Sequence, residues 1–153
     1  PVLVVCLEGD AEASRCRLVH LSRKWRIHGR APPSTHLLLA LHNVYTTALN
    51  AGLDPHEYVE HMPFDKVIEI HVSGGSWSEP NWLRSGRRMR LDSHDGAVPE
   101  EVWKLLESVL PRCSNLEGVT LERMEGTVEQ ADVESLHTEL RRIRRILELA
   151  HVR

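Results

Sequence analysis

The chain has 153 residues, of which 41% are hydrophobic and 27% charged, and its formal net charge is −3. This length suits one domain with its own core and is short for two. The balanced charge gives no reason to expect a nucleic-acid or anionic-membrane binder. The sequence contains neither an apolar stretch of membrane-spanning length nor a signal-peptide pattern.

The three cysteines are Cys6, Cys16 and Cys113, which lie far apart along the chain. Their odd number and wide spacing fit neither a disulfide framework nor a paired-thiolate zinc motif. A reducing cytoplasm is the simplest interpretation, and Cys6, within an apolar run, is interpreted as a small buried hydrophobe.

Strand and helix patterns alternate along the chain. Apolar, β-branched runs predict strands at residues 2–7, 37–41, 66–72 and 119–121. Helical spacing and capping residues predict helices at residues 11–28, 44–51, 55–61, 99–110 and 128–151. Strict alternation predicts a parallel sheet with right-handed crossovers. A complete α/β barrel needs about 250 residues, so four such units form a small open sheet or half a barrel.

Two segments stand apart from this alternation. Residues 73–88 are rich in Gly, Ser, Pro and Arg and predict a long loop, with Trp77 and Trp82 either lining a substrate lid or, as we favour, anchoring the loop. The last helix carries a run of arginines that we interpret as a solvated face rather than an RNA-binding surface: Arg141, Arg142, Arg144 and Arg145.

Polar side chains able to bind metal follow each predicted strand. These are Glu8 after the first strand, His42 and Asn43 after the second, His71 at the end of the third, Glu122 after the fourth, and Asp92 and His94 between the last two. Parallel strands followed by helices deliver their carboxyl ends to one shared face, where α/β barrels build active sites. Five such positions with carboxylate, amide and imidazole groups predict a metal centre. Oxygen and nitrogen donors without thiolates suit iron or manganese better than a structural zinc site.

Each of these residues also has a purely structural interpretation when taken alone. Glu8 can cap a helix, Asn43 can stabilise a turn, and His71 can be a hydrogen-bonded core histidine. Asp92 and His94 can pair within a turn, and Glu122 can pair with Arg123. Their joint placement at strand ends is what favours a metal site.

Several motifs resemble one family in the correct order. Residues 37–45 resemble a Leu-Leu-Leu-Asp-Val-Asn-Asn-Val-Tyr signature that continues through residues 50–58. Residues 69–74 resemble Glu-Ile-His-Leu-Ala-Gly, residues 92–99 resemble Asp-Thr-His-Asp-x-x-Val-Pro, and residues 120–122 resemble Leu-Ile-Glu. Together they resemble the multinuclear non-haem iron-dependent oxidative enzymes, the TIM-barrel family typified by the methanobactin-biosynthesis enzyme, whose members were long described only as a domain of unknown function.

The resemblance implies an α/β fold of parallel (β/α) units, in which residues 1–153 form one domain corresponding to the C-terminal half of a TIM-type barrel. Carried over residue by residue, the family's iron ligands fall on Glu8, Asn43, His71, Asp92, His94 and Glu122. The chain departs from the family at Ala40, where the family has Asp, at His42, where it has Asn, and at Gly75, where it has His. The family's N-terminal half supplies further histidine ligands, so we expect a missing N-terminal half or self-association to complete the barrel.

The function implied is oxidation of a cysteine-containing peptide by dioxygen at two or three iron ions, with manganese or zinc as other possible metals and a partner protein that delivers the peptide. Asp92 is expected to act at the catalytic centre, and His42 as an added ligand or an acid/base group. Two alternatives stay open. One is a non-catalytic interaction module, which Ala40 and Gly75 favour. The other is an isomerase or hydrolase with a single divalent metal.

Overall fold

The computed structural model describes residues 2–4 and 36–151, with backbone alone for residues 2–4 and 151. Four strands form one parallel sheet in the order β1-β2-β3-β4: β1 Val2–Val4, β2 His36–Ala40, β3 Val67–Val72 and β4 Gly118–Leu121. The α-helices are α2 Leu41–Ala51, α3 Pro55–Val59, α4 Glu100–Val109 and α5 Val133–His151, with 3₁₀ turns η1 Phe64–Lys66, η2 Leu110–Arg112 and η3 Gln130–Asp132. The predicted parallel α/β sheet is therefore confirmed. The helix predicted at residues 11–28 lies outside the described residues.

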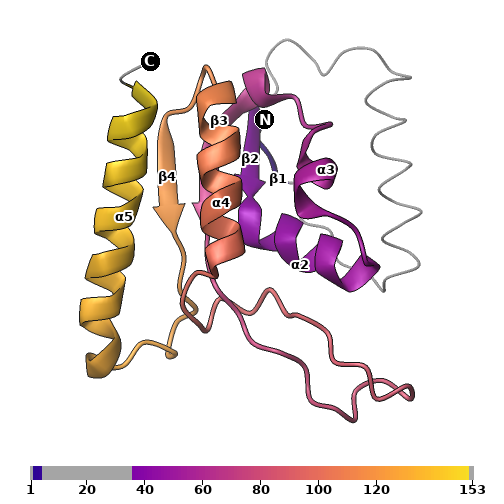
Figure 1. The fold of residues 1–153 in the computed structure, drawn as a ribbon. Helices are drawn as coiled ribbons and strands as arrows, with labels where there is room; N and C mark the ends of the chain where they lie inside the picture. The colour runs from indigo at the N-terminus through magenta and orange to yellow at the C-terminus, as the bar shows by residue number, and fades with distance from the viewer. Residues whose placement is uncertain (1, 5–35, 152–153) are drawn as a thin grey trace.

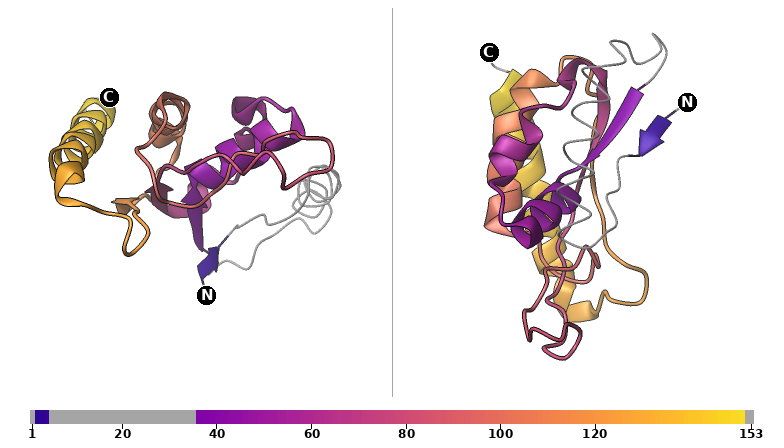
Figure 2. Two further views of the ribbon diagram at one scale, coloured as in Figure 1. Left: turned by 90° about the horizontal axis from the view of Figure 1, so that it is seen from below. Right: turned by 90° about the vertical axis from the view of Figure 1, so that its right-hand side faces the viewer.

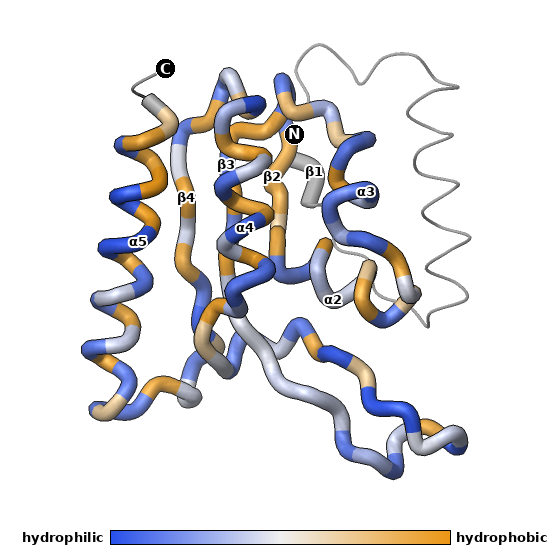
Figure 3. The backbone as a smooth tube through the Cα atoms, viewed as in Figure 1, coloured by the Kyte–Doolittle hydropathy of each residue, from blue (hydrophilic) through white to orange (hydrophobic). Residues whose placement is uncertain are grey.

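The helices α2 to α5 all cover one face of the sheet (Figures 1 and 2). Leu37 and Leu39 of β2 and Ile70 and Val72 of β3 are buried beneath them. Because successive side chains of a strand point to opposite faces, Glu69 and His71 lie on the face opposite the described helices. Figure 3 shows apolar residues concentrated along β2 and β3, while the long connection after β3 is mostly polar.

The boundaries of several elements differ from the prediction. Residue 41 was expected to end a strand and residue 44 to begin a helix, but β2 ends at Ala40 and α2 begins at Leu41. An apolar run cannot by itself distinguish a strand from a buried helical turn, and Leu41 is completely buried in the core. His42 and Asn43 consequently lie in the first helical turn rather than in a loop.

The last helix begins later than expected. Glu129 and Asp132 form reciprocal side-chain to backbone hydrogen bonds, which make a capping box around η3, and α5 begins at Val133 rather than at residue 128. The strand predicted at 66–72 begins at Val67, since Lys66 belongs to η1. The helix expected over 55–61 ends at Val59.

The connection between β3 and α4 is a long arm, as the sequence predicts. Residues 73–99 contain no helix and only an isolated antiparallel bridge, between Trp77 and Arg90. Asn50 at the end of α2 accepts from the Arg90 amide at 2.9 Å and donates to the Arg90 carbonyl at 2.8 Å. These two hydrogen bonds fix the backbone of Arg90 against α2. Residues 91–98 then lead back to the sheet.

The end of this arm packs directly on the backbone that leaves β3. A Cβ atom at Gly74 would overlap the carbonyl oxygen of Ala97, and one at Gly75 would overlap the carbonyl oxygen of Leu91. Only glycine permits so close an approach of two backbones. The two glycines therefore hold the segment with Asp92 and His94 against the carboxyl end of the sheet.

None of the helices in the described part of the chain combines the length and the apolar character that crossing a membrane requires.

Candidate metal centre

The structure brings six of the seven predicted site residues together at the carboxyl end of the sheet. His42 and Asn43 come from the first turn of α2, and His71 is the penultimate residue of β3. Asp92 and His94 lie in the arm, and Glu122 directly follows β4. The seventh, Glu8, lies outside the described residues.

These side chains form a continuous series in which carboxylates and imidazoles alternate. Its members, in order, are Glu69, His71, Glu122, His94, Asp92 and His42. The successive nitrogen–oxygen distances are 2.8, 2.8, 3.6, 3.2 and 2.6 Å. We call this series the imidazole–carboxylate chain. It joins β3, the residue after β4, the arm and the first turn of α2. Residues about 50 positions apart in the sequence, such as His42 and Asp92, are therefore in contact.

Asp92 is the most connected member of the series. Its Oδ1 lies 2.6 Å from His42 Nδ1 and 3.2 Å from His94 Nε2, and its Oδ2 accepts from Asn43 Nδ2 at 3.1 Å. Burial opposes ionisation of this carboxyl, but the hydrogen bonds from His42 and Asn43 and the nearby imidazoles hold the pKa of Asp92 below its ordinary value. The side chain is therefore a carboxylate at neutral pH.

Glu69 at the other end of the series was not among the predicted site residues. Its Oε1 accepts from Thr120 Oγ1 at 2.7 Å and lies 2.8 Å from His71 Nε2. The hydrogen bond from Thr120, followed by that from His71, lowers the pKa of Glu69. A signal for Glu69 was present in the sequence, because residues two apart on a strand share one face. Thr120 could not be identified in this way, since its role depends on the register that pairs it with His71.

The backbone at His94 adopts an unusual conformation. Its φ is 56°, the left-handed region that residues other than glycine seldom occupy. The His94 carbonyl accepts a hydrogen bond of 2.8 Å from the amide of Met124, two residues beyond Glu122. Non-glycine residues held in this region cluster at functional sites, where the surrounding structure enforces the conformation.

Glu122 does not pair with Arg123, the structural alternative that the sequence left open. Arg123 instead reaches Glu139 of α5, with a nitrogen–oxygen distance of 3.0 Å. The other carboxylate oxygen of Glu139, which is buried, accepts from the Val98 amide at 2.6 Å. This buried carboxylate connects α5 to the end of the arm and to the residue after Glu122, so it fixes the backbone on both sides of the imidazole–carboxylate chain.

The donor set fits a metal such as iron or manganese in its chemistry. It offers carboxylate and imidazole groups and no thiolate. His42 is 1% exposed, and its Nε2 has no hydrogen-bond partner among the described residues, although Asp92 holds Nδ1. A buried imidazole nitrogen without a partner is costly, and metal ligation is one way to satisfy it.

In the structure, however, the imidazoles and carboxylates pair with one another. Within residues 2–4 and 36–151, no group of three or more His, Cys, Asp or Glu side chains is placed to hold a metal ion. The imidazoles and carboxylates face each other at nitrogen–oxygen distances from 2.6 to 3.6 Å, so binding a metal requires these side chains to turn from one another. The ligand assignment stays a prediction, and it depends on Glu8 as well.

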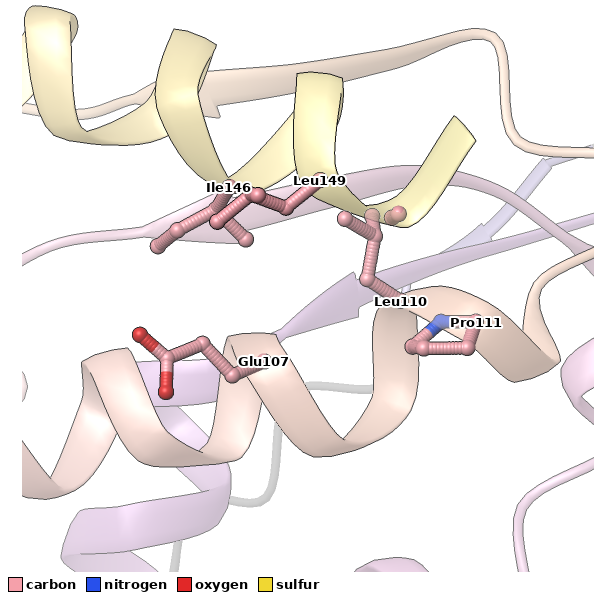
Figure 4. Close-up of a pocket in the computed structure, with 6 residues that line it drawn as sticks. Glu107, Leu110, Pro111, Ile146 and Leu149 are labelled. Atoms are coloured by element: carbon pink, nitrogen blue, oxygen red, sulfur yellow. The ribbon is translucent and has the colours of Figure 1, made fainter. Parts of the chain in front are cut away.

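A cleft on the helical side of the sheet lies away from these residues. It has a volume of about 250 Å³ and lies between α4, η2 and α5, where Glu107 and Leu110 face Ile146 and Leu149 (Figure 4). None of its lining residues belongs to the imidazole–carboxylate chain.

Comparison with known proteins assigns this fold and these motifs to a class. Residues 31–148 match the model of the family described as "RiPP precursor modification enzyme MbnB/TglH/ChrH". Because the match covers more than half of the chain, this protein belongs to that family. The resemblance identified from the motifs is confirmed.

The relatives carry a name that states no activity. A UPF0276 protein of Caulobacter vibrioides (strain NA1000 / CB15N) is 40% identical over 77 residues, which are 50% of this chain and 25% of that protein. UPF0276 proteins of Rhizorhabdus wittichii and Bordetella pertussis are 37% and 40% identical over 76 and 74 residues. Those matches cover 50% and 48% of this chain, and 24% and 25% of the relatives. The matched region thus spans about a quarter of the length of these relatives.

Proposed function

We propose that this chain is one half of an enzyme that oxidatively modifies a cysteine-containing peptide with dioxygen at two or three non-haem iron ions, and that it supplies several of the metal ligands. The family assignment supports peptide modification. The observation that carries the metal centre is the imidazole–carboxylate chain, in which predicted ligands from β3, β4, the arm and α2 meet at one end of a parallel sheet.

The residues proposed as ligands are Glu8, Asn43, His71, Asp92, His94 and Glu122. Bound iron would supply activation of dioxygen, with dioxygen as the oxidant. The chain's own contribution is to present carboxylates and imidazoles at fixed positions. The polar groups around Asp92 keep that carboxylate ionised, and the Glu139 contacts keep the backbone on either side of the site in place.

His42 is proposed to act at this centre through Nε2. Asp92 engages its Nδ1 at 2.6 Å, an arrangement that leaves Nε2 to bind a metal or to accept a proton from the substrate. The Cβ that a larger residue would have at position 75 would lie 2.8 Å from His42 Cε1. Gly75 therefore leaves room for the imidazole, which links the two departures from the family pattern at positions 42 and 75.

We further propose that the described sheet is half of a TIM-type barrel and that the domain is incomplete alone. Sequential parallel strands with all the described helices on one face are the arrangement of neighbouring units in such a barrel. In the part of the chain that the structure describes, the outer edges of β1 and β4 have no neighbouring strand, and such open edges favour association. An N-terminal half or a second copy would close it, and a separate partner protein would deliver the peptide. A cytoplasmic location is proposed because Cys113 is a free thiol.

Elemental analysis of anaerobically purified protein, with its mass in solution measured on the same sample, tests this proposal. Iron above one equivalent per chain, and oxygen consumption that depends on a cysteine-containing peptide, are the expected results. A protein that stays free of metal after reconstitution with ferrous iron would contradict a metal centre in this chain alone and would point to an incomplete or degenerate barrel. One tightly bound zinc or manganese ion without oxygen consumption would favour a hydrolase or isomerase.

A further inference from the structure

The imidazole of His71 is held from both sides. Its Nδ1 lies 2.8 Å from Glu122 Oε1 and its Nε2 lies 2.8 Å from Glu69 Oε1, while the side chain is 16% exposed. Both ring nitrogens are thus engaged, and the ring plane is fixed between two carboxylates. Glu69 and Glu122 differ, however, in their other neighbours.

Glu122 belongs to the side where the predicted ligands gather. Its second oxygen lies 3.6 Å from His94 Nδ1, and His94 in turn reaches Asp92. Glu69 lies on the other side of the ring, two residues nearer the amino end of β3, and its neighbour is Thr120 of β4. One nitrogen of His71 therefore faces the candidate ligands, and the other faces away from them.

Glu69 is itself fixed in position. Thr120 is directly opposite His71 in the parallel register of β3 and β4, and its hydroxyl donates to Glu69 Oε1 at 2.7 Å. The same oxygen lies 2.8 Å from His71 Nε2. A carboxylate that is 41% exposed would otherwise turn toward water, so the threonine keeps it directed at the ring.

We propose that Glu69 is a positioning residue, which holds His71 through Nε2–H and so presents Nδ1 as the nitrogen that binds the metal beside Glu122. Metal-ligating histidines usually donate their other ring N–H to a carboxylate or carbonyl, which sets the tautomer and the ring orientation. Loss of such a partner typically weakens metal binding about 10- to 100-fold. This inference rests on the proposed metal centre.

The hydrogen bond and the ligating nitrogen can both be observed by NMR of the histidine rings in ¹⁵N-labelled protein, with Zn²⁺ as a diamagnetic probe. His71 Nε2 is expected to carry a proton before and after Zn²⁺ is added, while the Nδ1 resonance shifts on addition. In Glu69→Leu, the Nε2–H signal should lose its protection from exchange with solvent. Zn²⁺ binding through Nε2 in the wild type would overturn the proposal.

Zn²⁺ affinity, measured by competition with a chelator, gives the second readout. We expect Glu69→Leu to weaken binding about 10-fold or more, and Thr120→Val to weaken it by a smaller factor in the same direction. Thr120→Ser retains the hydroxyl and should restore wild-type affinity. Glu117→Gln is the matched control, because Glu117 is an exposed carboxylate at the amino end of β4 and its loss changes the net charge equally.

The outcomes separate this inference from the function on which it rests. Unchanged Zn²⁺ affinity in Glu69→Leu, with the fold intact by circular dichroism, would overturn the positioning role and leave Glu69 and His71 as an ion pair on the sheet surface. A wild-type chain that binds neither Zn²⁺ nor iron would overturn the metal centre and, with it, this inference. A protected Nε2–H that disappears in Glu69→Leu, together with the loss of affinity, would support it.

Discussion

The two ends of the parallel sheet are built from different chemistry. At the carboxyl end, six imidazole and carboxylate side chains contact one another, and the backbone at His94 is in the left-handed region. At the amino end, apolar packing dominates, with Phe64 of η1 and Leu110 of η2 buried and the Cys113 thiol donating to Val109. In α/β barrels the carboxyl end carries the chemistry and the amino end the stability. The same division is visible here, and changes at each end should have separable effects.

The largest effect on stability is expected from Gly74→Ala, which affects the carboxyl end. The added methyl group would overlap the backbone of Ala97, so either β3 or the arm must move. Overpacking of this kind costs about 1–3 kcal/mol, and here it should also separate His94 from Glu122. Urea unfolding measures the cost. Gly118→Ala is the matched control, because nothing lies within 4 Å of a Cβ at that position in β4. Equal stability of the two variants would contradict the close approach.

A smaller and pH-dependent effect is expected at the amino end from Cys113. Burial raises the pKa of its thiol to about 11, from an ordinary value of 9.0. Between these values the folded chain binds more protons than the unfolded chain, so stability falls as pH rises through this window. Because one unit of pKa corresponds to about 1.4 kcal/mol, the rise of about two units limits the total loss to about 3 kcal/mol, of which about 2 kcal/mol should be lost by pH 10.5.

Comparing the wild type with Cys113→Ala at pH 8 and pH 10.5 isolates this contribution. The wild type should lose more stability than the variant over that interval, while Tyr58, whose pKa burial raises to about 12, contributes equally to both. At pH 8, Cys113 in the folded protein should resist alkylation by iodoacetamide until urea unfolds the chain. Mass spectrometry of the digested protein identifies the peptide that contains Cys113. Rapid alkylation of Cys113 in the folded protein would contradict the buried thiol.

The smallest effect is expected from Arg112, also at the amino end. Its guanidinium lies 4.0 Å from the centre of the Phe64 ring and 2.6 Å from Glu60. Arg112→Ala should reduce stability by about 0.5–1 kcal/mol, mostly through lost stacking, because exposed ion pairs contribute little. Arg112→Lys separates the two terms, since it keeps the charge and loses the planar stacking. Any change in metal binding would show that the two ends of the sheet are coupled.

The sequence was sufficient to predict the sheet, the long arm and most of the side chains that meet at the carboxyl end of the sheet. Apolar runs predicted β2 and β3, and the polar residues that follow strands predicted His71, Asp92, His94 and Glu122 as neighbours. What sequence patterns could not supply was register and backbone contact. The role of Thr120 depends on its pairing with His71, and the closeness of Gly74 to Ala97 depends on how the arm returns to the sheet. The start of α2 at Leu41 was missed because buried strands and buried helical turns have the same composition.

The measurement that tests the central claim most directly is a ferrous-iron titration of the wild type, Asp92→Ala and Glu100→Ala under anaerobic conditions. Asp92 connects three members of the site, whereas the Glu100 carboxylate pairs with Arg142 of α5 on the outer helical layer. We predict that the wild type and Glu100→Ala bind more than one iron per chain, and that Asp92→Ala loses most of this iron while keeping its fold by circular dichroism. Full iron content in Asp92→Ala would contradict the account.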